Sequence, residues 1–156
     1  MPDVVSRAKR SEMMSGIRSK NTKPEIIIRS ALHRAGFRFR LHTNRLPGKP
    51  DLVLPKYHAV ILVNGCFWHG HNCHLFKWPG TKKAFWRTKI LKNRANDEKT
   101  LTALDEKDWR VLVIWECALK GKQKHPIERI IDEVTGWLHS DDRYHEIRGM
   151  DAKSCV

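Results

Sequence analysis

The sequence predicts an α/β fold in which helices flank a mixed central sheet. Two short apolar runs, residues 59–63 and 111–115, have the length and composition of buried strands. Segments with helical periodicity lie before the first run, between the two runs and after the second. At 156 residues and 40% hydrophobic content, the chain fits one compact domain with a sizeable core.

The first predicted helix begins near Thr22. Thr22 suits the cap position, Pro24 suits the first turn, and Glu25 follows the threonine by three residues, which is the capping-box spacing. Gly36 ends the helix, and its apolar stripe comprises Ile27, Ile28, Ala31, Leu32 and Ala35. From this spacing alone, Glu25 needs no role beyond capping.

Two strands joined by a tight turn follow this helix. Residues 37–41 alternate apolar and basic side chains and predict a strand with one solvent-facing side. Residues 51–54 and 59–63 are then separated by four residues, so they should pair antiparallel. If Leu54 faces Ala59, Asp51 lies opposite Leu62, at the open end of the hairpin. Asp51 is therefore either an ordinary turn residue or a carboxylate at a polar site.

The second half of the chain supplies a long helix, a strand and a last helix. Residues 81–107 carry an apolar helical stripe that is interrupted by Asn93 and Asp97, with Lys89 on the adjoining face. These polar residues either mark the point where the helix leaves the core or face a site. Residues 109–115 predict a buried strand, and Pro126 opens the last helix. We expect residues 140–156 to form a loose polar tail.

Cysteines and histidines gather between residues 66 and 74. Cys66, His71 and Cys73 supply two thiolates and an imidazole, a ligand set that suits zinc. Cys117, which follows the second buried strand, is the leading fourth ligand, and His69 and His74 compete with it. Buried free cysteines are the alternative. The polar start of the chain lacks the pattern of a signal peptide, so we expect a reducing compartment and no disulfides.

The charge favours a polyanionic partner. The formal net charge is +13 and the pI is about 9.9, with basic residues concentrated in residues 1–50 and 77–99. Nucleic acid is the natural partner. No apolar run approaches the ~20 residues that span a bilayer, so we expect a soluble protein without a membrane partner. Within the basic N-terminal arm, Met14 and Ile17 share a helical face and either dock on the core or act as wedges into a ligand.

Several motifs together resemble the very short patch repair (Vsr-type) endonucleases of bacteria. They are Pro50-Asp51, the run NGCFWHGHNC at residues 64–73, Phe85-Trp86 and the WEC at residues 115–117. The resemblance covers roughly residues 7–138. It implies a restriction-endonuclease-like fold with a structural zinc. We expect a DNA-contacting arm at residues 1–20, one endonuclease domain at residues 21–139 and a flexible tail at residues 140–156.

The resemblance also assigns site residues. It implies zinc on Cys66, His71, Cys73 and Cys117, and magnesium on Asp51 with help from the backbone carbonyl of Val63. His69 would handle the proton of the attacking water, and Glu25 would support it. Phosphodiester hydrolysis needs a hard cation and a positioned base, which these residues can supply.

The remaining implied residues contact DNA. Phe67 and Trp68 would form an aromatic wedge beside the mismatch, while Lys89 and Asn93 lie near the mismatched bases; Met14 and Ile17 would enter from the other groove. Inserting a ring costs least stacking energy at a mismatch, so the wedge helps to select the lesion.

Two features depart from the expected pattern. The strand ends Val63-Asn64-Gly65, without the acid-x-Lys that many nucleases of this class carry. Asn64 stands where the family pattern has a second histidine. An amide cannot take up a proton, so Asn64 can position phosphate or water but cannot act as a general acid.

The implied function is a magnesium-dependent nick in one strand beside a T:G mismatch, the lesion left by deamination of 5-methylcytosine, which initiates very short patch repair. The expected partners are double-stranded DNA with that mismatch and mismatch-repair proteins. We expect a monomer in the bacterial cytoplasm, associated with the nucleoid. The alternatives are a restriction-like or general DNase of the same fold and a non-catalytic, zinc-stabilised DNA-binding module.

Overall fold

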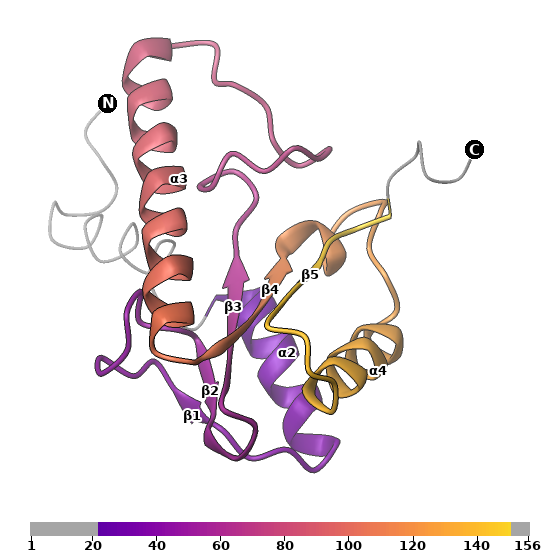
Figure 1. The fold of residues 1–156 in the computed structure, drawn as a ribbon. Helices are drawn as coiled ribbons and strands as arrows, with labels where there is room; N and C mark the ends of the chain where they lie inside the picture. Colours follow the sequence, from indigo (N-terminus) through magenta and orange to yellow (C-terminus); the bar gives the residue numbers. More distant parts are fainter. Residues whose placement is uncertain (1–21, 151–156) are drawn as a thin grey trace, which may run out of the picture.

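A five-stranded mixed sheet forms the centre of the protein in the computed structural model, which describes residues 22–150 (Figure 1). The spatial order of the strands is β1-β2-β3-β4-β5. β1, β2 and β3 pair antiparallel, whereas β3, β4 and β5 pair parallel. The strands span Arg40–Leu41 (β1), Leu52–Leu54 (β2), Ala59–Asn64 (β3), Arg110–Trp115 (β4) and Tyr144–Ile147 (β5). The predicted mixed α/β architecture is confirmed.

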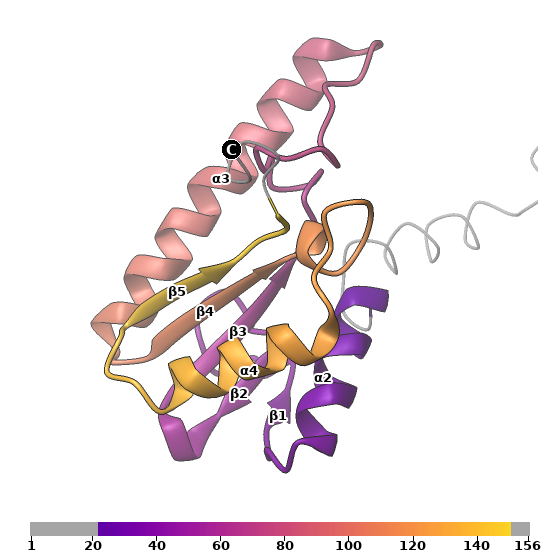
Figure 2. The ribbon, with the colours of Figure 1, turned by 90° about the vertical axis from the view of Figure 1, so that its right-hand side faces the viewer.

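Helices cover both faces of this sheet (Figure 2). One face packs against α2, Lys23–Arg34, and α4, Ile127–Leu138, through a core that includes Ile28, Ile61 and Ile130. The other face packs against α3, Lys83–Glu106, through a smaller core with Leu104 and strand valines. Burying each large aliphatic side chain contributes roughly 1.5–3 kcal/mol, so the alternating faces of β2, β3 and β4 fix the three-layer arrangement.

The start of α2 has the predicted capping geometry. The Thr22 hydroxyl accepts a hydrogen bond from the backbone N–H of Glu25 at 3.4 Å, and Pro24 lies in the first turn. At the other end, Gly36 takes a φ of +98°, which is accessible to glycine at little cost. The helix thus begins beside the sheet, with the Glu25 side chain buried.

The β2–β3 hairpin has the predicted register, because Leu54 pairs with Ala59 and Leu52 pairs with Ile61. The connection is a 3-10 turn over Pro55–Tyr57, after which His58 adopts a left-handed backbone. Asp51 therefore lies at the open end of the hairpin. The strand predicted over residues 37–41 is shorter, since only Arg40 and Leu41 pair with β2.

α3 connects the parallel strands β3 and β4, and its N-terminal half extends beyond the end of the sheet (Figure 1). The loop after β3, residues 65–82, lies beside this extension. This arrangement explains the polar residues in the apolar stripe of the helix. Ile90 and Leu104 are buried, whereas Asn93 and Asp97 contact the loop.

The expectation of a loose tail from residue 140 is wrong for residues 144–147. These residues form β5, which pairs parallel with β4 and buries Ile147. The strand is otherwise polar because it lies at the edge of the sheet, where apolar patterning is weak. Among residues 22–150, no helix is both long enough and apolar enough to cross a bilayer.

Candidate functional site

A cleft of about 890 Å³ opens at the end of the sheet where β3 leaves it. Its walls come from the start of α2, the loop before β2, the end of β3, the following loop and α3. The lining residues are Thr22, Pro24, His42, Asn44, Gly48, Lys49, Asp51, Leu62, Val63, Asn64, Gly65, Phe67, Trp68, His69, Lys89, Asn93, Asp97, Thr100 and Glu116. The hairpin, the loop and α3 thus bring together residues that are far apart in the sequence.

Asp51 is anchored in this cleft by the main chain of β3. Its Oδ2 accepts the backbone N–H of Val63 at 2.7 Å. Burial, together with the neighbouring carboxylate of Glu25, raises the pKa of Asp51 to about 7, and the hydrogen bond from Val63 opposes this rise. Two carboxylates held together in a partly dry site favour either a shared proton or a bound cation.

Glu25 lies in the first turn of α2, and its side chain also contacts other residues of the cleft. Its Oε2 accepts a hydrogen bond from the guanidinium of Arg29 at 3.0 Å and lies 2.7 Å from Nε2 of His42. The ligand atoms of Glu25, His42 and Asp51 all lie within 4.8 Å of one another. Spacing alone indicated only a capping residue, because His42 and Asp51 reach the carboxylate from the β1–β2 region.

His42 is a site residue that the sequence analysis missed. It follows β1, and its ring reaches Glu25 because its backbone φ is +46°. A lone histidine after a short strand carries no recognisable pattern. The fold alone brings it beside the two carboxylates.

His69 and Asp97 form a second polar pair in the cleft. Nδ1 of His69 lies 2.5 Å from Oδ2 of Asp97, which projects from α3. The carboxylate thereby fixes the orientation of the imidazole, and the edge of the ring faces Trp115 at a centroid distance of 5.9 Å. The helical stripe had singled out Asp97, but its partner could not be read from the sequence.

Phe67 and Trp68 belong to an aromatic cluster on the same wall. Both rings are half-buried and lie in contact with Trp86 of α3, at centroid distances of 5.3 Å and 6.0 Å. The side-chain amide of Asn93 donates to the carbonyl of Trp68 at 2.7 Å, which ties the loop to the helix. Lys89 lines the cleft one helical turn before Asn93. Contacts with α3 therefore hold the loop that places both rings in the wall of the cleft.

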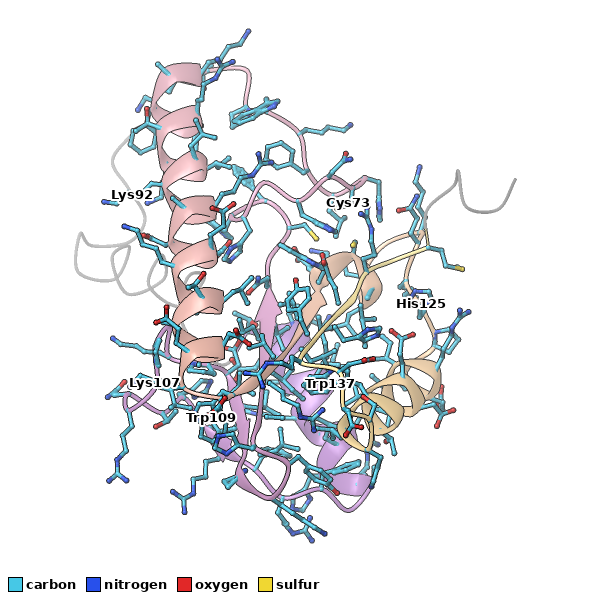
Figure 3. All side chains as sticks on the ribbon, viewed as in Figure 1. Cys73, Lys92, Lys107, Trp109, His125 and Trp137 are labelled. Atoms are coloured by element: carbon cyan, nitrogen blue, oxygen red, sulfur yellow. The ribbon has the colours of Figure 1, made fainter. Side chains whose placement is uncertain are left out.

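The four predicted soft ligands come together where this loop, which carries three of them, meets the segment after β4. The ligand atoms of Cys66, His71, Cys73 and Cys117 lie within 4.8 Å of one another. Nδ1 of His71 is 3.5 Å from Sγ of Cys66 and 3.6 Å from Sγ of Cys117. In a tetrahedral zinc site, sulfur and nitrogen ligands lie about 3.5–3.6 Å apart, so the residues fit the ion. Figure 3 marks Cys73 on the loop after β3.

The surroundings of the thiols suit a cation. A hydrogen bond with Cys117 raises the pKa of Cys66, and the same bond lowers the pKa of Cys117 to about 4. The backbone N–H groups of Cys117 and Gly149 donate to Sγ of Cys66 and Sγ of Cys117, respectively. Trp115 stacks on His71 with a centroid distance of 3.9 Å. Trp115, and not Phe67 or Trp68, covers the imidazole of this cluster.

The two competing histidines lie elsewhere. His69 pairs with Asp97, and Nδ1 of His74 lies 3.0 Å from the side-chain oxygen of Gln123. Asn64 ends β3 and lines the cleft. Met14 and Ile17 lie outside the described residues, so their proposed contacts remain predictions.

Comparison with known proteins identifies the family of this chain. Residues 2–75 match the family model for DNA mismatch endonuclease Vsr. The DNA mismatch endonuclease Vsr of Escherichia coli is 42% identical over 138 residues, which cover 88% of each chain. The chain belongs to the Vsr family of DNA mismatch endonucleases.

Two further relatives carry the names of nicking enzymes. The type II nicking enzyme V.XorIIP of Xanthomonas oryzae pv. oryzae is 44% identical over 85% of this chain and 98% of its own length. The type II nicking enzyme V.NmeAIP of Neisseria meningitidis is 42% identical over 86% of this chain and 97% of its own length. This Vsr protein is therefore a DNA endonuclease of mismatch repair, and its substrate is DNA.

Proposed function

We propose that this Vsr protein nicks one strand of a DNA duplex beside a T:G mismatch, with magnesium as the catalytic cation, and so initiates very short patch repair. One observation carries the proposal. A single cleft contains the anchored carboxylate of Asp51, the oriented imidazole of His69 and the paired rings of Phe67 and Trp68. A cation site, a base and a wedge are the parts that a mismatch nickase needs.

Asp51 and the main chain of Val63 are the proposed magnesium ligands. The hydrogen bond between them holds the carboxylate beside the end of β3, and a cation would favour the charged form of Asp51, whose pKa is raised mainly by burial. Magnesium takes carboxylate, carbonyl and water oxygens, so the donor set fits. When bound, magnesium stabilises the charge that develops on the phosphate oxygens.

His69 is the proposed base for the attacking water. Because Asp97 holds Nδ1, Nε2 is the nitrogen left to receive the proton, as in other carboxylate-oriented histidines. Glu25 supports the arrangement through its contact with His42 and its proximity to Asp51. Asn64 offers only an amide, so we propose that it positions phosphate or water.

Recognition is proposed to combine charge, stacking and polar contacts. The net charge of +13 attracts the phosphate backbone, and Lys89 and Asn93 lie on the wall that carries the aromatic pair. Insertion of Phe67 and Trp68 costs least at a weakly stacked base pair, which favours a mismatch over a matched site. The arm of residues 1–20, with Met14 and Ile17, is proposed to contact the other groove.

The Cys66, His71, Cys73 and Cys117 cluster is proposed to hold a structural zinc. Four protein ligands leave no open position for a substrate, which is the usual difference between structural and catalytic zinc sites. The mixed sheet, with its candidate site where β3 leaves it, supports the restriction-endonuclease-like class.

The test is a nicking assay on duplexes that differ in one base pair. A T:G duplex and its T:A counterpart, with the two strands carrying different labels, are incubated with and without magnesium. We expect one nick, in one strand of the T:G duplex, only with magnesium, and loss of that nick in Asp51→Asn while mismatch binding remains. Equal cleavage of both duplexes would indicate a general DNase, and binding without cleavage would indicate a DNA-binding module.

A further inference from the structure

His42 is held against the two carboxylates by its own backbone. Its N–H donates to the carbonyl oxygen of Asp51 at 3.2 Å, and its φ of +46° lies in the left-handed region, which is uncommon for residues other than glycine. The side chain is only 15% exposed, and the ring lines the cleft. A strained backbone and a largely buried ring at a cleft wall are typical of a functional position.

The distances suit shared coordination of one ion. Nε2 of His42 lies 2.7 Å from Oε2 of Glu25, and both atoms lie within 4.8 Å of a carboxylate oxygen of Asp51. In an octahedral site with bonds of about 2.1 Å, neighbouring ligand atoms lie about 3 Å apart. The separation of His42 and Glu25 matches neighbouring ligands of one ion, and the Asp51 carboxylate lies close enough to join them.

A purely structural salt bridge explains this cluster less completely. Arg29 already contacts Oε2 of Glu25 at 3.0 Å, so that buried carboxylate has a cationic partner without His42. The ligand atoms of Glu25 and Asp51 lie within 4.8 Å of each other, and two neighbouring carboxylates suit a divalent cation. Such a cation would also take the imidazole nitrogen of His42 as a ligand.

We propose that Nε2 of His42 and the carboxylate of Glu25 join Asp51 and Val63 as ligands of the proposed cation, and that this nitrogen makes the site bind Mn²⁺ more tightly than Mg²⁺. Mg²⁺ prefers oxygen ligands and loses its waters reluctantly, whereas first-row transition ions accept imidazole readily. The inference rests on the proposed function for the location of the catalytic cation.

Electron spin-echo spectroscopy of bound Mn²⁺ provides a direct test. In the zinc-loaded protein without DNA, we expect ¹⁴N modulation from a directly bound imidazole. The modulation should disappear in His42→Gln and His42→Ala. The control is His58→Gln, because His58 also has a left-handed backbone, with a φ of +51°, but stacks on Trp109. Absence of nitrogen modulation in the wild-type protein, or its persistence in both His42 variants, would overturn the inference.

Affinity supplies an independent measurement. Calorimetric titration of the His42→Gln protein should show Mn²⁺ binding weakened by about tenfold or more, with Mg²⁺ binding changed by less than about twofold. Equal losses for both ions would show that His42 only supports the fold. These outcomes can be told apart from those of the nicking assay. If the protein nicks T:G duplexes but bound Mn²⁺ shows no nitrogen ligand, only the role of His42 is wrong. If bound Mn²⁺ has a nitrogen ligand but no nick forms, only the mismatch function is wrong.

Discussion

Single carboxylates at this site have different roles because their surroundings differ. Glu25 is 1% exposed and contacts Arg29 and His42, so its charge is compensated by cationic or proton-bearing neighbours. Asp51 is largely buried and lies beside Glu25, so its ionised form is disfavoured, and a cation would favour it. Capping and a contact in the cleft coexist in Glu25, because its backbone N–H donates to Thr22 while its carboxylate contacts His42.

The pKa of Asp51 predicts a pH dependence of stability without added magnesium. The ordinary carboxyl pKa is 3.8 and burial raises it to about 7, so the folded protein binds a proton that the unfolded chain has released between these values. This contribution to stability is therefore complete below pH 4 and is lost as the pH rises through about 7.

Asp51→Asn removes this titration. We expect the variant to gain thermal stability relative to the wild-type protein between pH 5 and pH 8, in thermal melts of zinc-loaded protein without magnesium. Other titrating groups cancel in the comparison between the two proteins. Magnesium should raise the melting temperature of the wild-type protein at pH 8 and leave Asp51→Asn unchanged. Parallel pH profiles of the two proteins would show that Asp51 keeps its ordinary pKa.

At the scale of elements, the part of α3 up to Asp97 and the loop after β3 form one unit. Asp97 orients His69, Asn93 holds the carbonyl of Trp68, and Trp86 supports both loop rings. The helix extends past the sheet because these contacts replace the strand surface as its packing partner (Figure 1). The position of the aromatic pair therefore depends on α3 as much as on the loop.

Replacing Trp68 tests whether this unit acts as a wedge. Trp68→Ala should weaken binding to a T:G duplex by about 1–3 kcal/mol, the scale of one lost base–aromatic stack, and change binding to matched DNA much less. The measurement is fluorescence anisotropy in an Asp51→Asn background, which prevents cleavage. The control is Trp78→Ala, because Trp78 is 49% exposed and lies near Arg87. Loss of zinc, or a fully retained mismatch preference, would instead assign the ring to the support of the loop.

Over the whole molecule, the sequence predicted what local pattern controls. The apolar runs marked β3 and β4, and the four-residue connection set the pairing of Leu54 with Ala59. The strand β5 was missed because an edge strand needs few apolar residues, and only Ile147 of that strand is buried. The contact of His42 with Glu25 joins segments whose proximity the fold alone determines.

The candidate metal centre connects distant parts of the chain. Cys66, His71 and Cys73 follow β3, Cys117 follows β4, and the backbone N–H of Gly149, just beyond β5, donates to Sγ of Cys117. The ends of three neighbouring parallel strands therefore meet at one cluster. An ion bound there would hold the loop that carries His69 and the aromatic pair against the sheet.

Cys117→Ser should therefore affect more than its own surroundings. We expect less than one zinc per chain and a melting temperature lower by about 6–12 °C, which corresponds to roughly 3 kcal/mol in a chain of this size. Hydrogen exchange should quicken in β5 as well as in the loop after β3, because Gly149 loses its thiolate partner. His74→Gln is the matched control, since its ring contacts Gln123 outside the four-ligand group, and it should keep its zinc. One tightly held zinc in Cys117→Ser, with unchanged exchange in β5, would move the fourth ligand to His74 or His69.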